Sequence, residues 1–369
     1  MQQDKDDLYY QLALSFVSGI GPKFASGLIE QIGSAKAVFQ APLKQLIKVE
    51  GMGELRARAI KDETAFALAD KELAFIQSKS IQVFTQKDEA FPQRLLQCSD
   101  APQLLYYKGS ASLNANKTIA VIGTRKNTEY GQRLTNDLVE GLSKMNDILV
   151  VSGLAHGIDT IAHKASLKHH IETVGVLGHG LNTIYPAANK NLSTEMLEKG
   201  GLLTEFASQS KMDKGNFPSR NRIVAGISDV TVVVESDIKG GALITAYIAN
   251  SYNRDVAAFP GRAYDNKSSG NNMLIRKNMA TLITSADDLM EYMGWKKEKK
   301  KEVVQTQLML NLTNEEQSIV NLLQKKDNTH ADELQQNTGM GSSQLASCLL
   351  MLEMQGLIKT LPGKYYRMN

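Results

Sequence analysis

The chain has 369 residues, of which 42% are hydrophobic and 22% are charged, and its formal net charge is +3. This composition is typical of a soluble globular protein with two or three domains. No apolar run reaches the roughly 18 residues of a membrane-spanning helix, and the polar start "MQQDKDDLYY" is unlike a signal peptide. The two cysteines, Cys98 and Cys348, lie far apart and indicate neither a disulfide framework nor a metal site, so we expect a cytoplasmic protein.

The charge surplus is concentrated in one short stretch. Residues 296–302, "KKEKKKE", hold five lysines and two glutamates, and this run predicts a solvated linker that we place at 296–312. No predicted domain is strongly basic as a whole. Any contact with nucleic acid must therefore be local, and the best local candidate is 211–222, "KMDKGNFPSRNR", with four basic residues and one acidic residue.

Residues 1–85 are predicted to form a helical domain. Two segments, "VSGIGPKFASGLIEQIG" and "VEGMGELRARAIKD", each place Gly-x-Gly before an amphipathic helix. This is the pattern of a helix-hairpin-helix (or SAM-like) pair, whose glycine turns expose backbone N–H groups that can hold a phosphate. The balanced charge of the segment leaves open a second interpretation, a packing domain that uses glycines for tight turns.

Residues 86–295 are predicted to form a doubly wound α/β domain of Rossmann type, with its strands and helices between about 105 and 293. After a turn-rich connection over 86–110, continuous apolar runs alternate with helical patterns, as expected for a parallel sheet buried on both faces. Ligands of such sheets bind beyond the carboxyl ends of the strands. The predicted strands are "TIAVIG", "ILVVSG", "TVGVLG", "GLLTEF", "VTVVVE", "VAAFPG" and "TLITS".

Residues 313–369 contain three helical patterns and then a short hairpin through Pro362-Gly363, which is the outline of a winged helix. A winged helix that reads DNA would carry basic residues on its third helix. Here that helix has none and carries Met351, Leu352 and Met354. A protein-contacting or purely structural role is therefore favoured for this domain.

The segment 121–131, "VIGTRKNTEYG", predicts a strand, a glycine turn and the start of a helix. Gly123 would let the backbone approach a ligand, the following N–H groups could bind an anion, and Arg125 would add a guanidinium. The G-x-G-x-x-G fingerprint is missing, which disfavours a dinucleotide cofactor. The alternative is a tight turn with an exposed arginine.

The segment 152–163, "SGLAHGIDTIAH", places His156, Asp159 and His163 at spacings of three and four residues. A metal site can be drawn from such a helical face. A simpler interpretation is that Asp159 lies in the first turn of a helix, where the helix dipole favours a carboxylate.

The segment 216–229, "NFPSRNRIVAGISD", is the most unusual stretch, and we interpret it as a loop before the strand "VTVVVE". Arginines offer forks of donors suited to phosphate oxygens, and a phenylalanine offers a surface on which a base can stack. Several glycine turns are predicted to meet at the same sheet edge with uncommitted N–H groups, together with Arg125, Lys214, Arg220, Arg222 and Lys239. No catalytic constellation is recognisable.

These segments, in this order, resemble the DprA/Smf family of DNA-processing proteins. The resemblance covers most of 105–285, and the flanking domains are similar to accessory domains of the family. The segments that carry it are "VIGTRKNTEYG", "SGLAHGID", "VLGHGLNTIYP", "LLTEF", "FPSRNRIVAGISD", "GGALITA", "FPG" and "SSGNNMLI".

The resemblance implies a protein that binds single-stranded DNA without sequence preference during natural transformation. It also implies that the protein loads the RecA recombinase onto this DNA and helps RecA to displace single-strand-binding protein. The resemblance further implies a homodimer that needs no cofactor and has no enzymatic activity. His156 stands where the family usually has arginine, which would remove a cation, and "NMATLI" departs from the family's "GA" near the last strand. The DNA-binding residues implied or expected are Gly123, Thr124, Arg125, Lys126, Gly153, His156, Lys214, Phe217, Arg220, Asn221, Arg222 and Lys239.

Two alternatives remain open from the sequence. A phosphoribohydrolase-like enzyme has a related Rossmann core, but here "GGALITAYIAN" is followed by no catalytic carboxylate. A scaffold that contacts partners through its end domains fits their balanced charge, yet it leaves the basic residues of the central domain without a role.

Overall fold

The computed structural model describes residues 2–295, 312–326 and 328–368, which divide into two compact units. The first unit, residues 1–296, holds the helical domain and the large sheet, and the second begins at Lys297. None of the helices in the described ranges is long and apolar enough to cross a membrane. The predicted linker over 296–312 falls almost wholly outside the described residues.

The helical domain has two equivalent glycine turns. Gly19 and Gly51 each adopt φ of 77°, a backbone conformation that only glycine takes without strain, and Gly21 and Gly53 precede the next helices. The sequence repeat therefore corresponds to a structural repeat, as predicted. The helices are α1 (Gln2–Ser15), α2 (Pro22–Ile32), α3 (Ala35–Gln40), α4 (Leu43–Leu46), α5 (Glu54–Ile60) and α6 (Thr64–Ser78).

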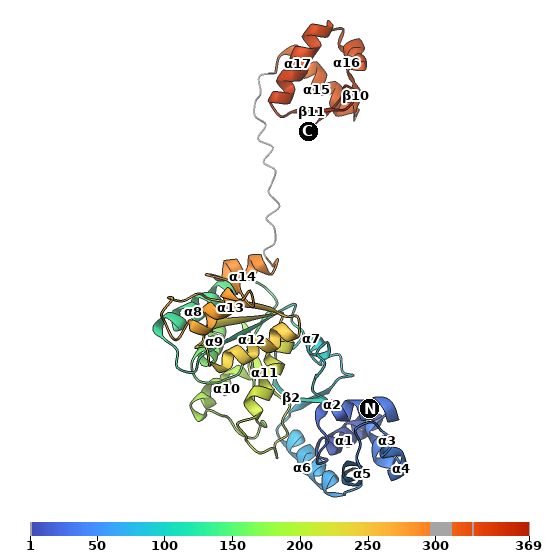
Figure 1. Cartoon of the computed structure of the whole chain (residues 1–369), viewed down its shortest axis with the longest axis vertical. Coiled ribbons are helices and arrows are strands. Elements are labelled where there is room, and N and C mark those ends of the chain that lie inside the picture. Colours follow the sequence, from blue (N-terminus) through green and yellow to red (C-terminus); the bar gives the residue numbers. More distant parts are fainter. Residues whose placement is uncertain (1, 296–311, 327, 369) are drawn as a thin grey trace. The chain divides into compact units, whose positions relative to one another are not determined.

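The sheet of the first unit has nine strands in the order β1-β2-β6-β5-β4-β3-β7-β8-β9. Figure 1 shows the chain coloured along its sequence, with most of the helices labelled. All seven predicted strands are present and run parallel, which confirms the doubly wound fold. The strands are β1 (Gln82–Thr85), β2 (Leu104–Gly109), β3 (Lys117–Gly123), β4 (Ile148–Ser152), β5 (Glu172–Val176), β6 (Gly200–Thr204), β7 (Val230–Glu235), β8 (Asp255–Ala258) and β9 (Thr281–Leu282).

Helices cover both faces of this sheet, which explains why its strands are apolar throughout. In β3, Ile119 and Val121 pack in the core shared with α8, α9 and α14, whereas Ala120 and Ile122 pack in the core shared with α11 and α12. The helices are α7 (Gln93–Leu96), α8 (Glu129–Leu142), α9 (Ile158–Lys168), the 3-10 turn η1 (Ala187–Asn189), α10 (Lys190–Met196), α11 (Asn216–Ile227), α12 (Gly241–Ser251), α13 (Ser269–Arg276) and α14 (Ala286–Tyr292).

Two strands were not predicted. β1 falls at the end of the segment expected to be helical, and β2 falls in the expected turn-rich connection; both extend the sheet in antiparallel fashion beyond β6. Tyr106 of β2 packs with the core of the helical domain, whereas Tyr107 packs with the core of the sheet. The run "LLYY" is therefore a strand with a different hydrophobic core on each face.

The second unit has the helices and the hairpin predicted for a winged helix. Its core is formed by side chains from all three helices and from β11, among them Ile319, Leu334, Leu349 and Ile358. The elements are α15 (Asn314–Lys325), β10 (Thr329–His330), α16 (Ala331–Thr338), α17 (Ser342–Met354), β11 (Ile358–Leu361) and β12 (Tyr365–Met368).

Candidate nucleic-acid interface

A cavity of about 630 Å³ opens at the carboxyl ends of the parallel strands. It lies at the topological switch point of the sheet. The strands β4 to β6 follow on one side of β3 and the strands β7 to β9 on the other, and doubly wound proteins bind ligands at this point. Its wall includes Gly123, Thr124 and Arg125 after β3, Gly153, Ala155 and Asp159 around the start of α9, Tyr185, Lys214 and the α11 residues Phe217, Arg220 and Asn221, and Gly240, Ala242, Ile244 and Thr245 after β7.

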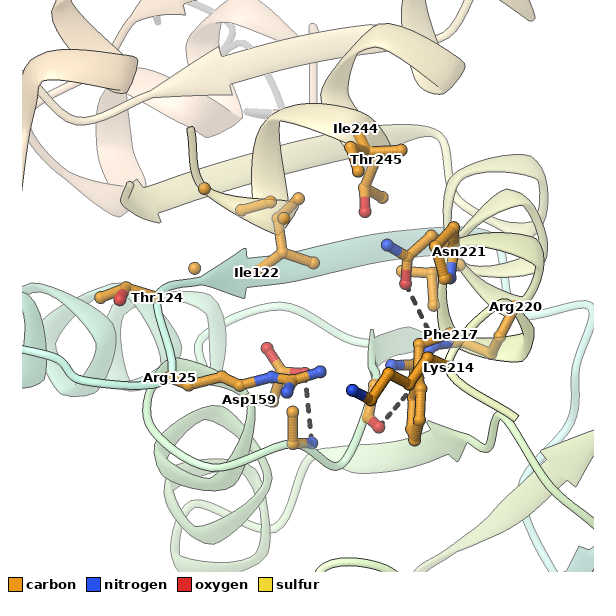
Figure 2. Close-up of a pocket in the computed structure, with 18 of the residues that line it drawn as sticks. Ile122, Thr124, Arg125, Asp159, Lys214, Phe217, Arg220, Asn221, Ile244 and Thr245 are labelled. Atoms are coloured by element: carbon orange, nitrogen blue, oxygen red, sulfur yellow. Dashed lines mark hydrogen bonds between the residues drawn. The ribbon is translucent and has the colours of Figure 1, made fainter. Parts of the chain in front are cut away.

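Two exposed cations extend into this cavity from opposite sides, as Figure 2 shows for Arg125 and Lys214. Phe217 lines the same cavity, and the Arg125 guanidinium carbon is 5.7 Å from the Phe217 ring centroid. The Tyr185 ring centroid lies 5.9 Å from that of Phe217, with the two rings tilted by 52°. Cations and aromatic rings therefore share one wall, an arrangement that suits a chain of phosphates and bases.

Arg220 is in the cavity wall but is almost completely buried, with 4% of its surface exposed. We interpreted its segment as a loop; the segment is instead helix α11, and Arg220 points back beneath it. Its Nη1 donates to the carbonyl oxygens of Gly153 and Val176, at the ends of β4 and β5. Burial lowers the pKa of Arg220 to about 10, so the guanidinium stays protonated at neutral pH. Arg220 thus fastens α11 to the sheet, and its contact with DNA stays a prediction.

Asp159 is a buried acid whose charge interacts with that of this arginine. Its carboxylate accepts a hydrogen bond of 3.2 Å from the Ala155 N–H, and burial raises its pKa while the positive charge of Arg220 lowers it. The prediction that the turns keep their N–H groups uncommitted is therefore wrong for Ala155. It is wrong for Thr124 too, whose N–H donates to the Glu235 carbonyl at 2.7 Å. At these two turns the N–H groups of Ala155 and Thr124 are therefore not free to bind a phosphate.

Arg222 does not belong to this site. Its guanidinium pairs with the Glu205 carboxylate and donates to the Asp100 carbonyl, and it does not line the cavity. The remaining predicted cations, Lys126 and Lys239, are exposed on the turns beside the cavity but outside its wall.

Asn221 lies in the wall of the cavity, and His156 lies beside the cavity. The Asn221 side-chain oxygen accepts from Arg220 Nε at 3.1 Å, so this residue braces the buried arginine and also lines the cavity. His156 is exposed and lines a hollow of about 20 Å³ beside the cavity, together with Arg125 and Phe217. A side chain at position 156 can therefore reach the same region as Arg125.

Two of the predicted glycines serve internal packing. A Cβ at Gly153 would lie 2.4 Å from the Arg220 guanidinium, and one at Gly123 would lie 2.5 Å from the Ile158 side chain. Glycine is therefore required at both positions because a side chain would clash with Arg220 or Ile158. Their approach to a DNA backbone stays a prediction.

The structure does not assemble the metal site considered for 152–163. His156 is exposed, whereas His163 is fully buried and its Nδ1 lies 2.7 Å from the Thr173 hydroxyl. Across the described ranges, no group of three or more His, Cys, Asp or Glu side chains could hold a metal ion. Asp159 lies in the first turn of α9, as the simpler interpretation expected.

His163 makes stability sensitive to acid. Burial lowers its pKa to about 3, whereas the unfolded value is about 6.5. The unfolded chain therefore binds the proton more tightly, and stability is lost as the pH falls below about 6.5. We expect about 2 kcal/mol to be lost between about pH 7 and about pH 5.

Urea unfolding of the wild type and His163→Asn at both pH values measures this loss. The variant should lose less stability on acidification because Asn does not titrate. Equal losses in the two proteins would contradict the assignment to His163.

Some lining residues were not among the predicted site residues, notably Tyr185, Asp159, Ile244 and Thr245. Asp159 had a signal in the sequence, because a carboxylate that directly follows a buried strand and an apolar turn needs an internal partner. Tyr185 lies in "VLGHGLNTIYP", one of the segments that carry the family resemblance, but only the fold brings it beside Phe217.

The sequence profile of the family described as DNA recombination-mediator protein A matches residues 82–294, which is more than half of the chain. The chain belongs to this family, DprA/Smf. The DprA winged helix domain profile matches residues 305–364, and the profile of a SAM-like helix-hairpin-helix tandem matches residues 12–65. The resemblance seen in the sequence is thereby confirmed, together with the types of the two flanking domains.

Several DprA/Smf relatives are similar over most of their length. Protein Smf of Synechocystis sp. is 35% identical over 289 residues, 77% of this chain and 72% of the relative, and DprA of Streptococcus pneumoniae is 37% identical over 64% of this chain and 82% of the relative. The crystal structure of S. pneumoniae DprA matches with a TM-score of 0.63 at 31% identity, covering 77% of this chain and 97% of that one. A structure of Helicobacter pylori DprA, described for its single-stranded DNA binding mode, matches with a TM-score of 0.52 at 31% identity, covering 57% and 95%.

Proposed function

We propose that this chain binds single-stranded DNA without sequence preference in the cavity at the strand ends. The observation that carries the proposal is the cavity wall that Arg125 and Lys214 share with the Phe217 and Tyr185 rings. Cations neutralise phosphates of any sequence, and an aromatic ring stacks on any base. The single-stranded DNA binding described for the H. pylori relative supports this assignment. In the proposed complex, Gly123, Thr124, Gly153, His156 and Asn221 border the strand, and Lys126 and Lys239 lie close enough to add charge.

A binding assay titrated with salt tests the proposal. Affinity for a single-stranded oligonucleotide should fall with increasing salt, and the cavity should contribute about −3 to the log–log slope, because each of about four phosphate contacts contributes about −0.7. Double-stranded oligonucleotide should bind more weakly, since its bases are already stacked and cannot reach Phe217. A slope near zero, or equal affinity for both forms, would contradict the proposal.

We further propose that the DNA-bound chain is a homodimer that loads the RecA recombinase onto incoming DNA during natural transformation. Membership of the DprA/Smf family supports this role. The loading is tested by the lag before RecA filaments form on DNA coated with single-strand-binding protein, which the chain should shorten. The dimer is tested by light scattering.

We propose a cytoplasmic binding protein without catalytic activity or cofactor, rather than a phosphoribohydrolase. Asp159, the acidic residue in the cavity wall, is buried and faces Arg220, so it is not free to attack or protonate a substrate. Release of free base from nucleoside monophosphates would contradict this proposal.

A further inference from the structure

The outer face of the small sheet in the second unit is the basis of a separate inference. This sheet has the order β10-β12-β11, with both pairings antiparallel. Its inner face contributes Ile358, Tyr366 and Met368 to the hydrophobic core around α15 and α17. Because successive side chains of a strand alternate between faces, the intervening residues must lie on the opposite, outer face.

The outer face carries an aromatic row beside a pair of cations. Tyr365 pairs with Leu361 on one side and with His330 on the other, so that these three side chains lie in a row across the sheet. The His330 and Tyr365 rings meet edge to face with centroids 5.0 Å apart, and Tyr365 is 42% exposed. Lys359 lies directly opposite Arg367 in the register, and both are exposed.

The charge of this hairpin has one sign. Residues 358–368 include Lys359, Lys364 and Arg367 and no acidic residue, whereas helix α17 has no basic residue. Two acids from outside the hairpin contact this sheet: the Asp332 carboxylate lies 3.5 Å from His330 Nδ1, and Glu353 Oε1 accepts a hydrogen bond of 3.1 Å from the Thr360 N–H. Our expectation for this domain considered the third helix alone, and the electrostatic attraction for a polyanion is on the wing.

We infer that the outer face of the β10-β12-β11 sheet is a second contact for single-stranded DNA. Tyr365 stacks on a base, while Lys359 and Arg367 bind the flanking phosphates and Lys364 adds charge at the turn. An exposed ring supported by neighbours on a sheet is a stacking platform that tolerates any base. The inference extends the proposed function, because it gives one chain two separate contacts with the same strand.

Photo-cross-linking separates the two contacts. The full chain is irradiated with a long oligothymidylate that carries 5-bromodeoxyuridine, and the cross-linked peptides are identified by mass spectrometry. We expect cross-links in the peptide with Tyr365 as well as in the peptide with Phe217, and loss of the former alone in Tyr365→Ala. Cross-links near Phe217 alone would overturn this inference and leave the proposed function standing, whereas cross-links near Tyr365 alone would support this inference and overturn the cavity as the binding site.

Salt titration provides an independent measurement on the same oligonucleotide. The triple variant Lys359→Gln, Lys364→Gln, Arg367→Gln should make the log–log slope shallower by about 2, which is 0.7 for each of three lost phosphate contacts. Lys325→Gln removes an exposed cation from α15, away from this face, and should leave the slope unchanged. Tyr365→Phe keeps the ring and should bind like the wild type, whereas Tyr365→Ala should bind about tenfold more weakly. A triple variant that retains its thermal transition and the wild-type slope would overturn the inference.

Discussion

Phe217→Ala is expected to weaken the binding of single-stranded DNA by about 1–3 kcal/mol, or about 5- to 150-fold, because the loss of one base-stacking ring has this effect. The ring sits at the centre of the cavity wall, between Tyr185 and the Arg125 guanidinium. Arg125→Ala should weaken binding as well and make the salt dependence shallower by about 0.7. Fluorescence anisotropy with a labelled oligothymidylate, measured across a salt series, gives both quantities.

The controls for this prediction separate the site from its surroundings. Phe217→Tyr keeps the ring and should retain most of the affinity. Arg133→Ala removes an exposed arginine of α8 outside the cavity wall, so it should change neither affinity nor salt slope. Wild-type affinity in the double variant Phe217→Ala, Arg125→Ala would show that the DNA binds elsewhere on the chain.

Arg220→Met is expected to destabilise the first unit by about 3–5 kcal/mol, because it removes a buried charged donor from two carbonyls and a compensating charge from the interior. The substitution leaves the carbonyls of Gly153 and Val176 without their donor and removes the positive charge of Arg220 that lowers the pKa of Asp159. Burial already raises the pKa of Asp159, so the variant should lose further stability as the pH rises above about 4, where the unfolded carboxyl ionises first. Chemical denaturation over a pH series measures both effects.

A double-mutant cycle tests whether Arg220 acts through Asp159. Asp159→Asn added to Arg220→Met should recover part of the lost stability and abolish the extra loss at rising pH, because position 159 then carries no carboxyl group. Lys214→Met removes an exposed cation from the same wall and should weaken DNA binding without changing stability. If Arg220→Met lost affinity at unchanged stability, Arg220 would be a DNA ligand rather than an internal anchor.

The parts of the fold that depend on local patterns could be predicted from the sequence. The seven parallel strands are continuous apolar runs, and the helix-hairpin-helix pair and the winged helix have their own repeats and turns. The strand β2 was missed because "LLYY" is short and only the four-residue helix α7 precedes it, which is too short to mark a βαβ unit. Its burial comes from Tyr106 and Tyr107 facing two different cores, which no local pattern reveals.

The site was predicted less completely, for a physical reason. The sequence identifies Arg220 and Arg222 as polar residues in an apolar setting, but their partners are Val176, Glu205 and other groups distant in the chain. Whether an arginine is free to bind a ligand or forms hydrogen bonds and ion pairs within the protein depends on these long-range partners. Glu205, an acid at the end of the buried run "GLLTEF", was the available signal that one arginine would be neutralised internally.

The two faces of β2 bear on how this chain can be shortened or recombined. A truncation near residue 85 would follow the predicted boundary of the helical domain. It would also remove the helices that shield Leu104 and Tyr106 from water. The exposed strand would then present an apolar surface to other molecules, with a risk of aggregation. A viable truncated chain would need polar replacements along that side of β2, so loss or exchange of the helical domain requires several coordinated changes rather than a single cut.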